Sequence, residues 1–561
     1  MADKWTPQQE QAVKDRGGKL LVSAAAGSGK TKVLVDRLMH YLTDPDDPAD
    51  LDEFLIITYT KAAASELRGK IAAKLTEKIA EEPENRQLQK QMQRLFLTKI
   101  STVHGFCADV LRQYAYRLDI APDFRVADEN ECREIRETVM TAMLDGMYAN
   151  ALSDEDFRVF VDTQGMGRSD ALVPQIVEKV YNSAMCHLDP DDWLDKCLAG
   201  TACEGLTDAS QTPWGEYLIR DLQDTLDAEL RVLDICLEQL GRDAAMEKFE
   251  THISAIARQL RQLRQCSTWD AVVENRSIDY GRFPTVRKNI DPELKDRVKA
   301  AKDACKKALD KKMRFFTDKS HQILTDVAQT SAASRGLIAL VRQFETGFRQ
   351  AKRSRRVLDF SDLEHRTLDI LLGKNRTTPT AIAREIGRQF REVMVDEYQD
   401  SNKVQDAIFN ALTEERNNCF MVGDVKQSIY QFRLADPKIF LEKYNSYLPA
   451  DQAKAGEGRK VMLSHNFRSG VEVIEGVNHV FRTCMSPRVG DLYYGDEEAL
   501  RQWIPTPPLG RPGVELHVLY TEEDKYSREA AYVARRIEQM LRKSCLCAPK
   551  RVRGRWSLMI S

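Results

Sequence analysis

Residues 20–31 read Leu-Leu-Val-Ser-Ala-Ala-Ala-Gly-Ser-Gly-Lys-Thr, and they decide the fold of this chain. The opening apolar run predicts a buried strand, Gly27–Thr31 predicts a tight loop, and the following residues have helical periodicity. Glycines let backbone N–H groups converge on phosphates, and the helix adds the positive end of its dipole. Lys30 is then expected to reach the β- and γ-phosphates, and Thr31 to hold Mg²⁺. Although Ala24 stands where the usual pattern has its first glycine, the stretch predicts a nucleoside triphosphate site.

The composition is that of an ordinary globular protein. The chain has 561 residues, 42% of them hydrophobic and 30% charged, which is too long for one core, so several domains are expected. Lys+Arg 83 against Asp+Glu 86 gives a formal net charge of -3, so any nucleic acid contact must come from a local basic groove. The N-terminus does not have the layout of a signal peptide, and no apolar run is long enough to span a bilayer. We therefore expect a cytoplasmic protein without a membrane partner. The twelve cysteines form no Cys-x-x-Cys pair, so neither a zinc ribbon nor a disulfide framework is expected.

Strand-like runs alternate with helical sequence in two separate parts of the chain. The first part contains Lys19–Ser23, Phe54–Thr58 and Thr98–Thr102, and strands return at Val393–Asp396 and Cys419–Gly423. Such alternation predicts an α/β fold, in which helices cover a parallel sheet and the phosphate loop lies at the carboxyl edge of a central strand.

This pattern divides the chain into four parts. Residues 1–125 and 355–447 are expected to form a first α/β domain, interrupted by an all-helical insertion over residues 126–354. Residues 448–543 are expected to begin a second α/β domain that is incomplete. Residues 544–561 continue no periodic pattern, and we expect them to be an out-of-frame or otherwise aberrant tail.

The second α/β unit is expected to open with a strand at Lys460–Leu463. It should continue through a strand at Val514–Leu519 to a helix around Arg528–Leu541.

Two adjacent carboxylates end the apolar run before Tyr398. Asp396 is suited to hold Mg²⁺ through water, and Glu397 is close enough to polarise an attacking water. Most Asp-Glu pairs are surface pairs, but this one follows a buried strand in a chain that already has a phosphate loop, which favours catalysis.

A second polar segment, Gly423–Arg433, also follows a strand. Gln427 is placed to sense a γ-phosphate by hydrogen bonding. Tyr430 and Phe432 offer stacking faces and Arg433 a cation, which is the combination expected where unpaired bases are held. Aromatics at this spacing are otherwise often part of a core.

Further candidate residues lie at three other strand ends. Arg468 is suited to reach the γ-phosphate across a cleft because its planar fork binds phosphate bidentately, and Phe467 is suited to stack on the nucleotide base. In isolation, Arg468 reads as an exposed strand-end arginine. Four side chains suit a DNA backbone and base, although the histidine among them is alone more often structural: Thr58, Tyr59, Thr102 and His104.

Together these segments resemble the successive motifs of superfamily 1 helicases. In chain order the matching segments are Gln9 with Ala12-Val13, the loop to Thr31, Thr58–Ala63, Thr102–Gly105, Val395–Ser401, Gly423–Arg433 and Asn466–Ser469. Within the UvrD/RecB-like group, three stretches most resemble the A subunits of AddAB-type ATP-dependent helicase/nucleases: Ser23–Gly27, Leu97–Cys107 and Leu358–Glu364.

The resemblance covers residues 1 to about 540 and carries expectations about fold and function. It implies a RecA-like motor domain 1A with a helical insertion 1B and the start of a motor domain 2A. It also implies 3′→5′ translocation on single-stranded DNA with ATP and Mg²⁺, unwinding of double-stranded DNA in double-strand-break repair and recombination, and a heterodimer with a helicase/nuclease subunit of the AddB type. Gln9 would read the adenine. The nucleotide would be held by Ala24, Ala25, Ala26, Gly27, Ser28, Gly29, Lys30 and Thr31, the Ala-rich form of the loop.

The chain departs from that family in its later part. The family's later helicase motifs, including an arginine that completes the ATP site, and its C-terminal nuclease domain have no counterpart in these residues. Loss of an arginine finger costs about 10³–10⁵ in rate. We therefore expect this chain to be truncated relative to the family, and its hydrolysis of ATP without the missing part stays open even if ATP binds.

Two other functions stay open. One is a UvrD-like repair helicase without a nuclease partner. The other is a truncated, inactive fragment that binds ATP and DNA without turnover. An assay for DNA-stimulated phosphate release would separate the inactive fragment from the helicase/nuclease subunit and from the repair helicase, because only the two helicases release phosphate in response to DNA.

Overall fold

The computed structural model describes most of the chain. The described residues are 5–16, 18–118, 120–150, 154–164, 170–285, 290–373, 375–429, 435–487, 489–503, 513–521, 524–542, 550–552 and 555–557. They form two compact units: Met1–Ser23 with Thr31–Val461, and Ala24–Lys30 with Met462–Ser561. Within the described ranges, none of the helices combines the length and apolar character needed to cross a membrane.

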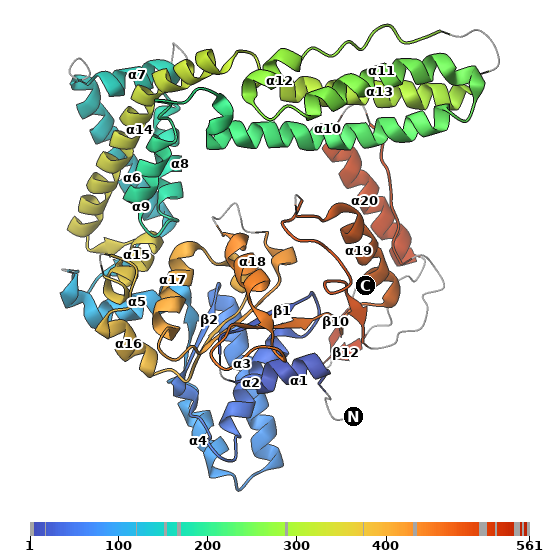
Figure 1. Ribbon diagram of the computed structural model, residues 1–561. Helices are drawn as coiled ribbons and strands as arrows, with labels where there is room; N and C mark the ends of the chain where they lie inside the picture. The colour runs from blue at the N-terminus through green and yellow to red at the C-terminus, as the bar shows by residue number, and fades with distance from the viewer. Residues whose placement is uncertain are drawn as a thin grey trace. The chain divides into compact units, whose positions relative to one another are not determined.

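A seven-stranded sheet lies at the centre of the α/β fold (Figure 1). Its strand order is β3-β2-β6-β7-β1-β9-β8. The strands are β1 Leu20–Ala24, β2 Phe54–Thr58, β3 Lys99–Thr102, β6 Glu392–Val395, β7 Cys419–Gly423, β8 Leu448–Pro449 and β9 Arg459–Leu463. All residues of β1, β2, β6 and β7 are buried, as expected for parallel strands with helices on both faces. The predicted α/β fold is therefore confirmed.

Most helices of this fold begin at a polar cap that the sequence supplies. The side chain of Thr60 accepts from Ala63 N at the start of α3, and the side chain of Asn402 accepts from Gln405 N at the start of α17. The helices around the sheet are α1 Pro7–Lys14, α2 Lys30–Leu42, α3 Lys61–Glu81, α4 Arg86–Arg94, α5 Val103–Tyr114, α15 Phe360–Leu371, α16 Ala381–Arg388, α17 Lys403–Thr413 and α18 Pro437–Ser446. The short 3₁₀ turns are η1 Leu51–Glu53, η2 Ala115–Arg117, η3 Ala209–Gln211, η4 Ala244–Met246, η5 Tyr398–Asp400 and η6 Val425–Gln427.

A buried ion pair joins α2 to β6. Arg37 is 1% exposed, and its Nε and Nη2 donate to the two carboxylate oxygens of Glu392 at 2.8 and 2.5 Å. Its Nη1 donates to the carbonyl oxygens of Ala12 and Asp15 at 2.8 and 2.7 Å, and the Tyr41 hydroxyl donates to Glu392 at 3.1 Å. Burial alone would lower the pKa of Arg37, but the Glu392 carboxylate raises it above its ordinary value. The pair therefore holds α1, α2 and β6 together as charged groups.

Arg37→Met is expected to lower the free energy of unfolding by about 3–5 kcal/mol, because it leaves the Glu392 carboxylate buried without its partner. Denaturant unfolding of the two proteins measures the difference. The control is Arg388→Met, because Arg388 pairs with Glu415 on the surface, where water screens the two charges and the pair adds little to stability. An Arg37→Met protein as stable as the control would contradict the assignment.

The helical insertion leaves and rejoins the α/β fold at one point. There, β4 Arg125–Val126 pairs in parallel with β5 Val357–Leu358, and the described elements between them are helical. These helices are α6 Glu129–Ala149, α7 Glu155–Gln164, α8 Val173–Ala184, α9 Pro190–Ala199, α10 Pro213–Leu240, α11 Glu247–Arg264, α12 Trp269–Asn275, α13 Pro292–Met313 and α14 Ser320–Ser354. A large helical insertion, as the sequence predicts, is therefore present.

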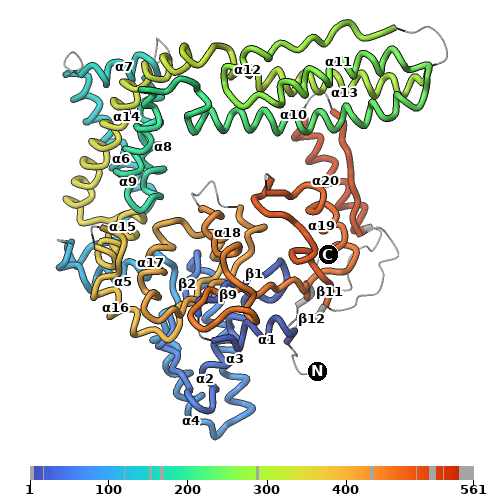
Figure 2. Tube along the Cα trace, viewed as in Figure 1, coloured from blue at the N-terminus to red at the C-terminus, as the bar shows by residue number. Residues whose placement is uncertain are grey.

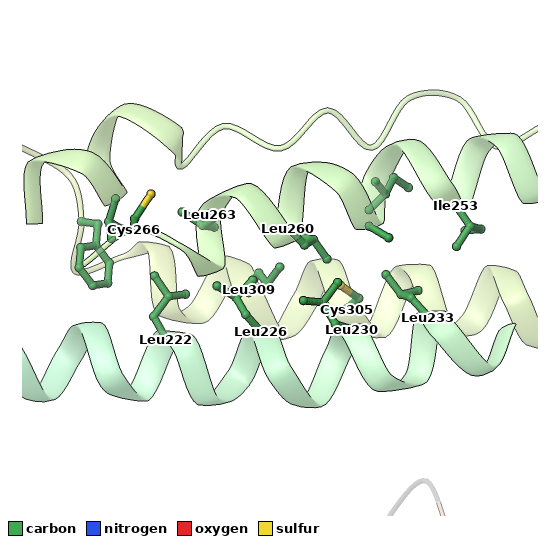
Figure 3. Packing of buried hydrophobic residues seen from close by; sticks show 14 of the residues in the cluster. Leu222, Leu226, Leu230, Leu233, Ile253, Leu260, Leu263, Cys266, Cys305 and Leu309 are labelled. Carbon is green, nitrogen blue, oxygen red and sulfur yellow. The ribbon is translucent and has the colours of Figure 1, made fainter. Parts of the chain in front are cut away.

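The insertion has two separate cores. In one, α14 packs along α6, α8 and α9, which precede it far back in the chain (Figure 2). In the other, the long α10 packs against α11 and α13 through regularly spaced apolar residues such as Leu226, Leu260 and Leu309 (Figure 3). The helical periodicity of the sequence is thus explained by burial, and the remaining charged residues form the solvated faces.

The second unit differs from the sequence prediction in two places. The strand expected to open it lies instead in the seven-stranded sheet as β9, where Arg459 N donates to Lys19 O at 2.9 Å and the Arg459 side chain pairs with Asp15 at 2.7 Å. Residues 514–519 form no strand: Leu516 and Val518 are 90% and 85% exposed, and none of the strands in the described ranges pairs with them. The other bounds are β10 His465–Asn466, β11 Arg501–Gln502, α19 Val471–Cys484, α20 Lys525–Arg542, β12 Lys550–Val552 and β13 Arg555–Ser557.

The predicted helix near the C-terminus is α20. In the tail, β12 and β13 pair antiparallel. The division of the chain into four domains stays a prediction.

Candidate active site

The carboxyl ends of four adjacent strands form one edge of the sheet. In the parallel register, Ser23 of β1 pairs with Gly423 of β7, Met421 of β7 pairs with Val395 of β6, and Val395 pairs with Ile57 of β2. Open α/β sheets bind ligands outside this edge. In the first unit, the acidic and polar segments directly follow β6 and β7 at this edge, and the predicted phosphate loop is the segment that follows β1 in the chain.

The phosphate loop has the backbone that the sequence predicts. Gly27 and Gly29 have φ values of 71° and 84°, in the left-handed region that glycine adopts without strain. Ser28 N donates to Ala25 O at 3.1 Å, and the 13-residue helix α2 begins at Lys30. A glycine-shaped turn that leads directly into a helix N-terminus suits phosphate oxygens. The residues present therefore fit a triphosphate.

The segment around Asn466 supports this loop within the second unit. Asn466 Nδ2 donates to Ala26 O at 2.7 Å, and Phe467 N donates to Gly27 O at 2.9 Å. Asn466 Oδ1 accepts from Arg468 N at 2.7 Å. A Cβ atom at Gly27 would lie 2.7 Å from Asn466 Nδ2, so a side chain at that position would displace the support.

Phe467 and Arg468 follow Asn466 directly. The Phe467 ring lies against Trp503, with centroids 5.9 Å apart, and Arg468 is exposed. These positions do not test base stacking by Phe467 or phosphate binding by Arg468, and both roles stay predictions.

Gln9 is buried at the start of α1. Its Oε1 accepts from Thr6 N at 3.1 Å, and Gln9 N donates to Thr6 Oγ1 at 3.1 Å, which together make a capping box. The side chain thus has a structural role at this helix start, and adenine recognition by Gln9 stays a prediction.

The two acidic residues follow β6 in a strained turn. Asp396 N continues the strand by donating to Ile57 O at 3.0 Å, and Glu397 N donates to Asp396 Oδ1 at 3.0 Å. Glu397 has φ 51° and ψ 44°, a left-handed conformation that costs a non-glycine residue about 1–3 kcal/mol. Such strain is concentrated at functional sites, which supports the catalytic interpretation of this carboxylate.

A cavity of about 490 Å³ lies at the ends of β2, β6 and β7 within the first unit. It brings together the predicted residues Thr58, Tyr59, Asp396, Glu397 and Gln427. The other lining residues are Thr60, Ala63, Gln399, Asp400, Lys426 and Ile429.

The β7 end of this cavity is organised by Asp424. Its carboxylate is 1% exposed, accepts from Gln427 Nε2 at 2.7 Å, and pairs with Lys426 Nζ at 2.8 Å. Gln427 is therefore held by a buried carboxylate at the cavity wall. The next predicted residues, Tyr430, Phe432 and Arg433, lie outside the described residues.

The predicted DNA-contacting residues of β2 and β3 differ in their surroundings. The Tyr59 hydroxyl bonds to Ser401 Oγ, and burial raises the pKa of Tyr59 well above its ordinary value. Thr58 is 2% exposed and donates to Thr60 O at 3.1 Å, while Thr102 caps α5 by accepting from Gly105 N at 3.1 Å. The two threonine hydroxyls thus have structural partners, and their contact with DNA stays a prediction.

His104 is held by a buried carboxylate that sequence reasoning gave no role. Its Nε2 lies 3.1 Å from Glu364 Oε1, and its ring packs on Phe360 with centroids 4.4 Å apart. Glu364 is 5% exposed and also accepts from Gln405 Nε2 at 2.7 Å and Asn402 Nδ2 at 3.3 Å. Phe360 is 53% exposed, so the pair presents an aromatic face to solvent next to the site.

Glu364→Gln is expected to reduce the loss of stability on acidification. Burial would raise the pKa of Glu364, but hydrogen bonds from His104, Gln405 and Asn402 lower it below 4.5. A depressed folded pKa gives stability that is present above the unfolded value and lost as pH falls through the folded value. The fall in thermal midpoint between about pH 6, above the unfolded value, and about pH 3 should therefore be smaller in Glu364→Gln than in the parent protein.

The control for this measurement is Glu414→Gln, because Glu414 is exposed on another element. It should keep the parent protein's fall in thermal midpoint. An unchanged fall in Glu364→Gln as well would contradict a role for the Glu364 carboxylate in stability.

Several organising residues lie within the segments matched in the sequence analysis but were assigned no role there. They are Glu364, Gln399, Asp424, Lys426 and Asn466. Three of them lie within three residues of a predicted site residue that they support, so proximity in sequence was the available signal. For Glu364 that signal is absent, since its partner His104 is far away in the chain.

Comparisons with known proteins bear on this site. A family model described as the UvrD/REP helicase N-terminal domain matches residues 5–448. The A subunit of an ATP-dependent helicase/nuclease from Pelotomaculum thermopropionicum is 36% identical over 541 residues, which cover 92% of this chain and 42% of the relative. Proteins of the same name from Moorella thermoacetica and Clostridium novyi are 36% and 33% identical, with 92% and 96% of this chain and 37% and 45% of the relatives covered.

These matches confirm the resemblance found in the sequence, to ATP-dependent helicases and to the A subunits of helicase/nucleases in particular. The chain spans about two fifths of the length of the curated relatives that it matches.

Proposed function

This chain belongs to the UvrD/REP helicase family, and we propose that it is the ATP-driven motor part of a DNA helicase. The observation that carries it is the strained Asp-Glu pair at the end of a buried parallel strand, in a chain whose left-handed glycine turn after β1 leads directly into a helix. The loop suits a triphosphate and the carboxylates suit its hydrolysis, as a motor requires.

In this proposal, the residues predicted to bind phosphate, hold Mg²⁺ or activate water each have one role. Lys30 binds the β- and γ-phosphates, Thr31 and Asp396 hold Mg²⁺, and Glu397 takes the proton of the attacking water. Gln427 and Arg468 contact the γ-phosphate. Hydrolysis of ATP with Mg²⁺ supplies the free energy for movement along DNA.

The metal site of this proposal uses few protein ligands. Among the residues that the structure describes, no group of three or more His, Cys, Asp or Glu gathers to hold a metal ion. Mg²⁺ in phosphoryl-transfer sites is usually bound by one or two protein side chains, waters and substrate phosphates. Thr31 and Asp396 alone therefore suffice as its protein ligands.

The DNA side of the proposal uses the aromatic residues at neighbouring strand ends. Tyr59 and His104 lie at the ends of β2 and β3, and Phe360 offers an exposed face beside His104. Base stacking on such faces tolerates any sequence, as a translocating protein needs. The predicted base contacts of Tyr430, Phe432 and Arg433 also belong to this proposal, and these residues lie outside the described ranges.

The finer proposal follows the resemblance found in the sequence, and the relatives are named as A subunits of ATP-dependent helicase/nucleases. We propose 3′→5′ translocation on single-stranded DNA, unwinding of double-stranded DNA, and a role in double-strand-break repair in the cytoplasm. The partner would be a helicase/nuclease subunit of the AddB type. In domain terms, residues 1–125 and 355–447 would be motor domain 1A, residues 126–354 the insertion 1B, and residues 448–543 part of 2A.

The test is phosphate release by the 561-residue chain with and without a single-stranded oligonucleotide, together with nucleotide binding. We expect binding of ATP and a slow release that DNA stimulates. Binding without any DNA-dependent release would contradict the motor proposal and favour a module that only binds ATP and DNA.

A further inference from the structure

We propose that Gln399 is a positioning residue that fixes the Glu397 carboxylate and joins it to the Asp424–Gln427 segment. The inference rests on the proposed function, in which Glu397 activates water. Gln399 lies in η5, two residues after Glu397, and its side chain is 2% exposed at the wall of the 490 Å³ cavity.

Both ends of the Gln399 carboxamide are used. Its Nε2 donates to Glu397 Oε2 at 2.9 Å, and its Oε1 accepts from Asp424 N at 2.9 Å. The Asp424 N–H therefore fixes which way the carboxamide points, because only the oxygen can accept from it. The NH₂ group is then aimed at the carboxylate, and a hydrogen bond to a charged group is among the stronger ones in proteins.

Gly423 provides the space for this arrangement. A Cβ atom built there would lie 2.3 Å from Gln399 Oε1 and 3.2 Å from Gln399 N. Gly423 is in the buried strand β7, where glycine normally weakens a strand. A close approach of the Gln399 side chain explains why a glycine occupies this position.

The Gln399 side chain also links Glu397 to the segment that contains Gln427, the residue proposed to contact the γ-phosphate. Asp424, whose N–H bonds to Gln399, holds both Gln427 and Lys426 through its carboxylate. A displacement of Gln399 would therefore move the water-activating carboxylate and loosen the support of Gln427 together. Misplacement of a catalytic group by about 1 Å can cost about 10²-fold in rate.

The first test measures the contact without nucleotide. In Gln399→Glu a second carboxylate faces Glu397 Oε2, and the thermal midpoint of the 561-residue chain should fall by at least about 2 °C. Adding Glu397→Gln should restore most of this loss, because the new amide donates to the new carboxylate. The control is Gln343→Glu, an exposed change on α14 with no charged residue one turn away, which should leave the midpoint unchanged.

The second test separates binding from turnover. Gln399→Ala and Gly423→Ala should each lower the DNA-stimulated kcat by about 10²-fold. The dissociation constant for ATP should change less than about twofold, because Gln399 acts through Glu397 and the phosphate loop is untouched. If Gln399 had only a structural role, its loss would not lower kcat while leaving the dissociation constant for ATP unchanged. Nor would Glu397→Gln restore the thermal midpoint of Gln399→Glu.

The outcomes separate this inference from the proposed function. If Glu397→Gln is inactive but Gln399→Ala turns over normally, or Glu397→Gln fails to rescue Gln399→Glu, the positioning role is overturned and the proposed function stands. If Glu397→Gln itself turns over normally, the proposed function fails. If Gln399→Ala does not fold, the charge-exchange pair decides the question.

Discussion

Lys30→Ala is expected to raise the dissociation constant for ATP by about 10²-fold, because it removes a charged hydrogen-bond donor worth about 2–3 kcal/mol. Lys30 is the first residue of α2, directly after the left-handed Gly29, so its side chain starts where phosphates would meet the helix N-terminus. Titration of the 561-residue chain with a fluorescent ATP analogue measures the constant. DNA-stimulated phosphate release should disappear with the binding.

The control for this change is Lys32→Ala in the same helix. Lys32 bonds to Asp36 at 3.0 Å, so its loss removes a similar charge without touching the loop. It should alter ATP affinity by less than about threefold. Equal affinities in the parent protein and Lys30→Ala would mean that the nucleotide binds elsewhere.

Glu397→Gln is expected to lower DNA-stimulated phosphate release by about 10²–10⁴-fold, the usual loss when a general base is removed. The amide has the size of the carboxylate, and its oxygen still accepts from Gln399 Nε2, so the fold should be kept. The affinity for ATP should therefore stay within about threefold of the parent value. Radiolabelled phosphate release measures the rate, and the analogue titration measures the affinity.

The matched control is Glu415→Gln, an exposed carboxylate that pairs with Arg388 on the surface. It should release phosphate at the parent rate. Normal turnover by Glu397→Gln would show that the water is activated by another group.

Much of the sheet is predictable from sequence because its central strands are buried on both faces. Cys419–Gly423 and Phe54–Thr58 are continuous short runs whose structural bounds coincide with the predicted ones. The strand at 459–463 was also predicted, but its place in the sheet was not. That place depends on pairing with Lys19 and Asp15, more than four hundred positions earlier in the chain.

The predicted strand Val514–Leu519 is a case in which an apolar run does not form the strand that its sequence predicts. Its apolar run is typical of a buried strand, yet Leu516 and Val518 are exposed, and no strand within the part of the chain that the structure describes pairs with them. Composition indicates what a segment is able to form, whereas a strand exists only where a partner supplies hydrogen bonds.

The candidate site likewise contains residues that the sequence predicts and supporting residues that it does not predict. Gly27–Thr31 and Asp396-Glu397 were found from residue type and spacing, because phosphate and metal chemistry needs those groups in a short segment. The supports of these groups were not found, since Asn466 contacts Ala26, and Glu364 contacts His104, only after folding. Long-range hydrogen bonds of this kind leave no local pattern.

The central claim is that this sheet edge is the ATP site of a DNA-driven motor. The most direct measurement is phosphate release from ATP by the 561-residue chain and by Glu397→Gln, each with and without single-stranded DNA. The account predicts release that DNA stimulates in the parent chain, and its loss in a Glu397→Gln protein that still binds ATP. Release that is equal with and without DNA, or that survives in Glu397→Gln, would contradict it.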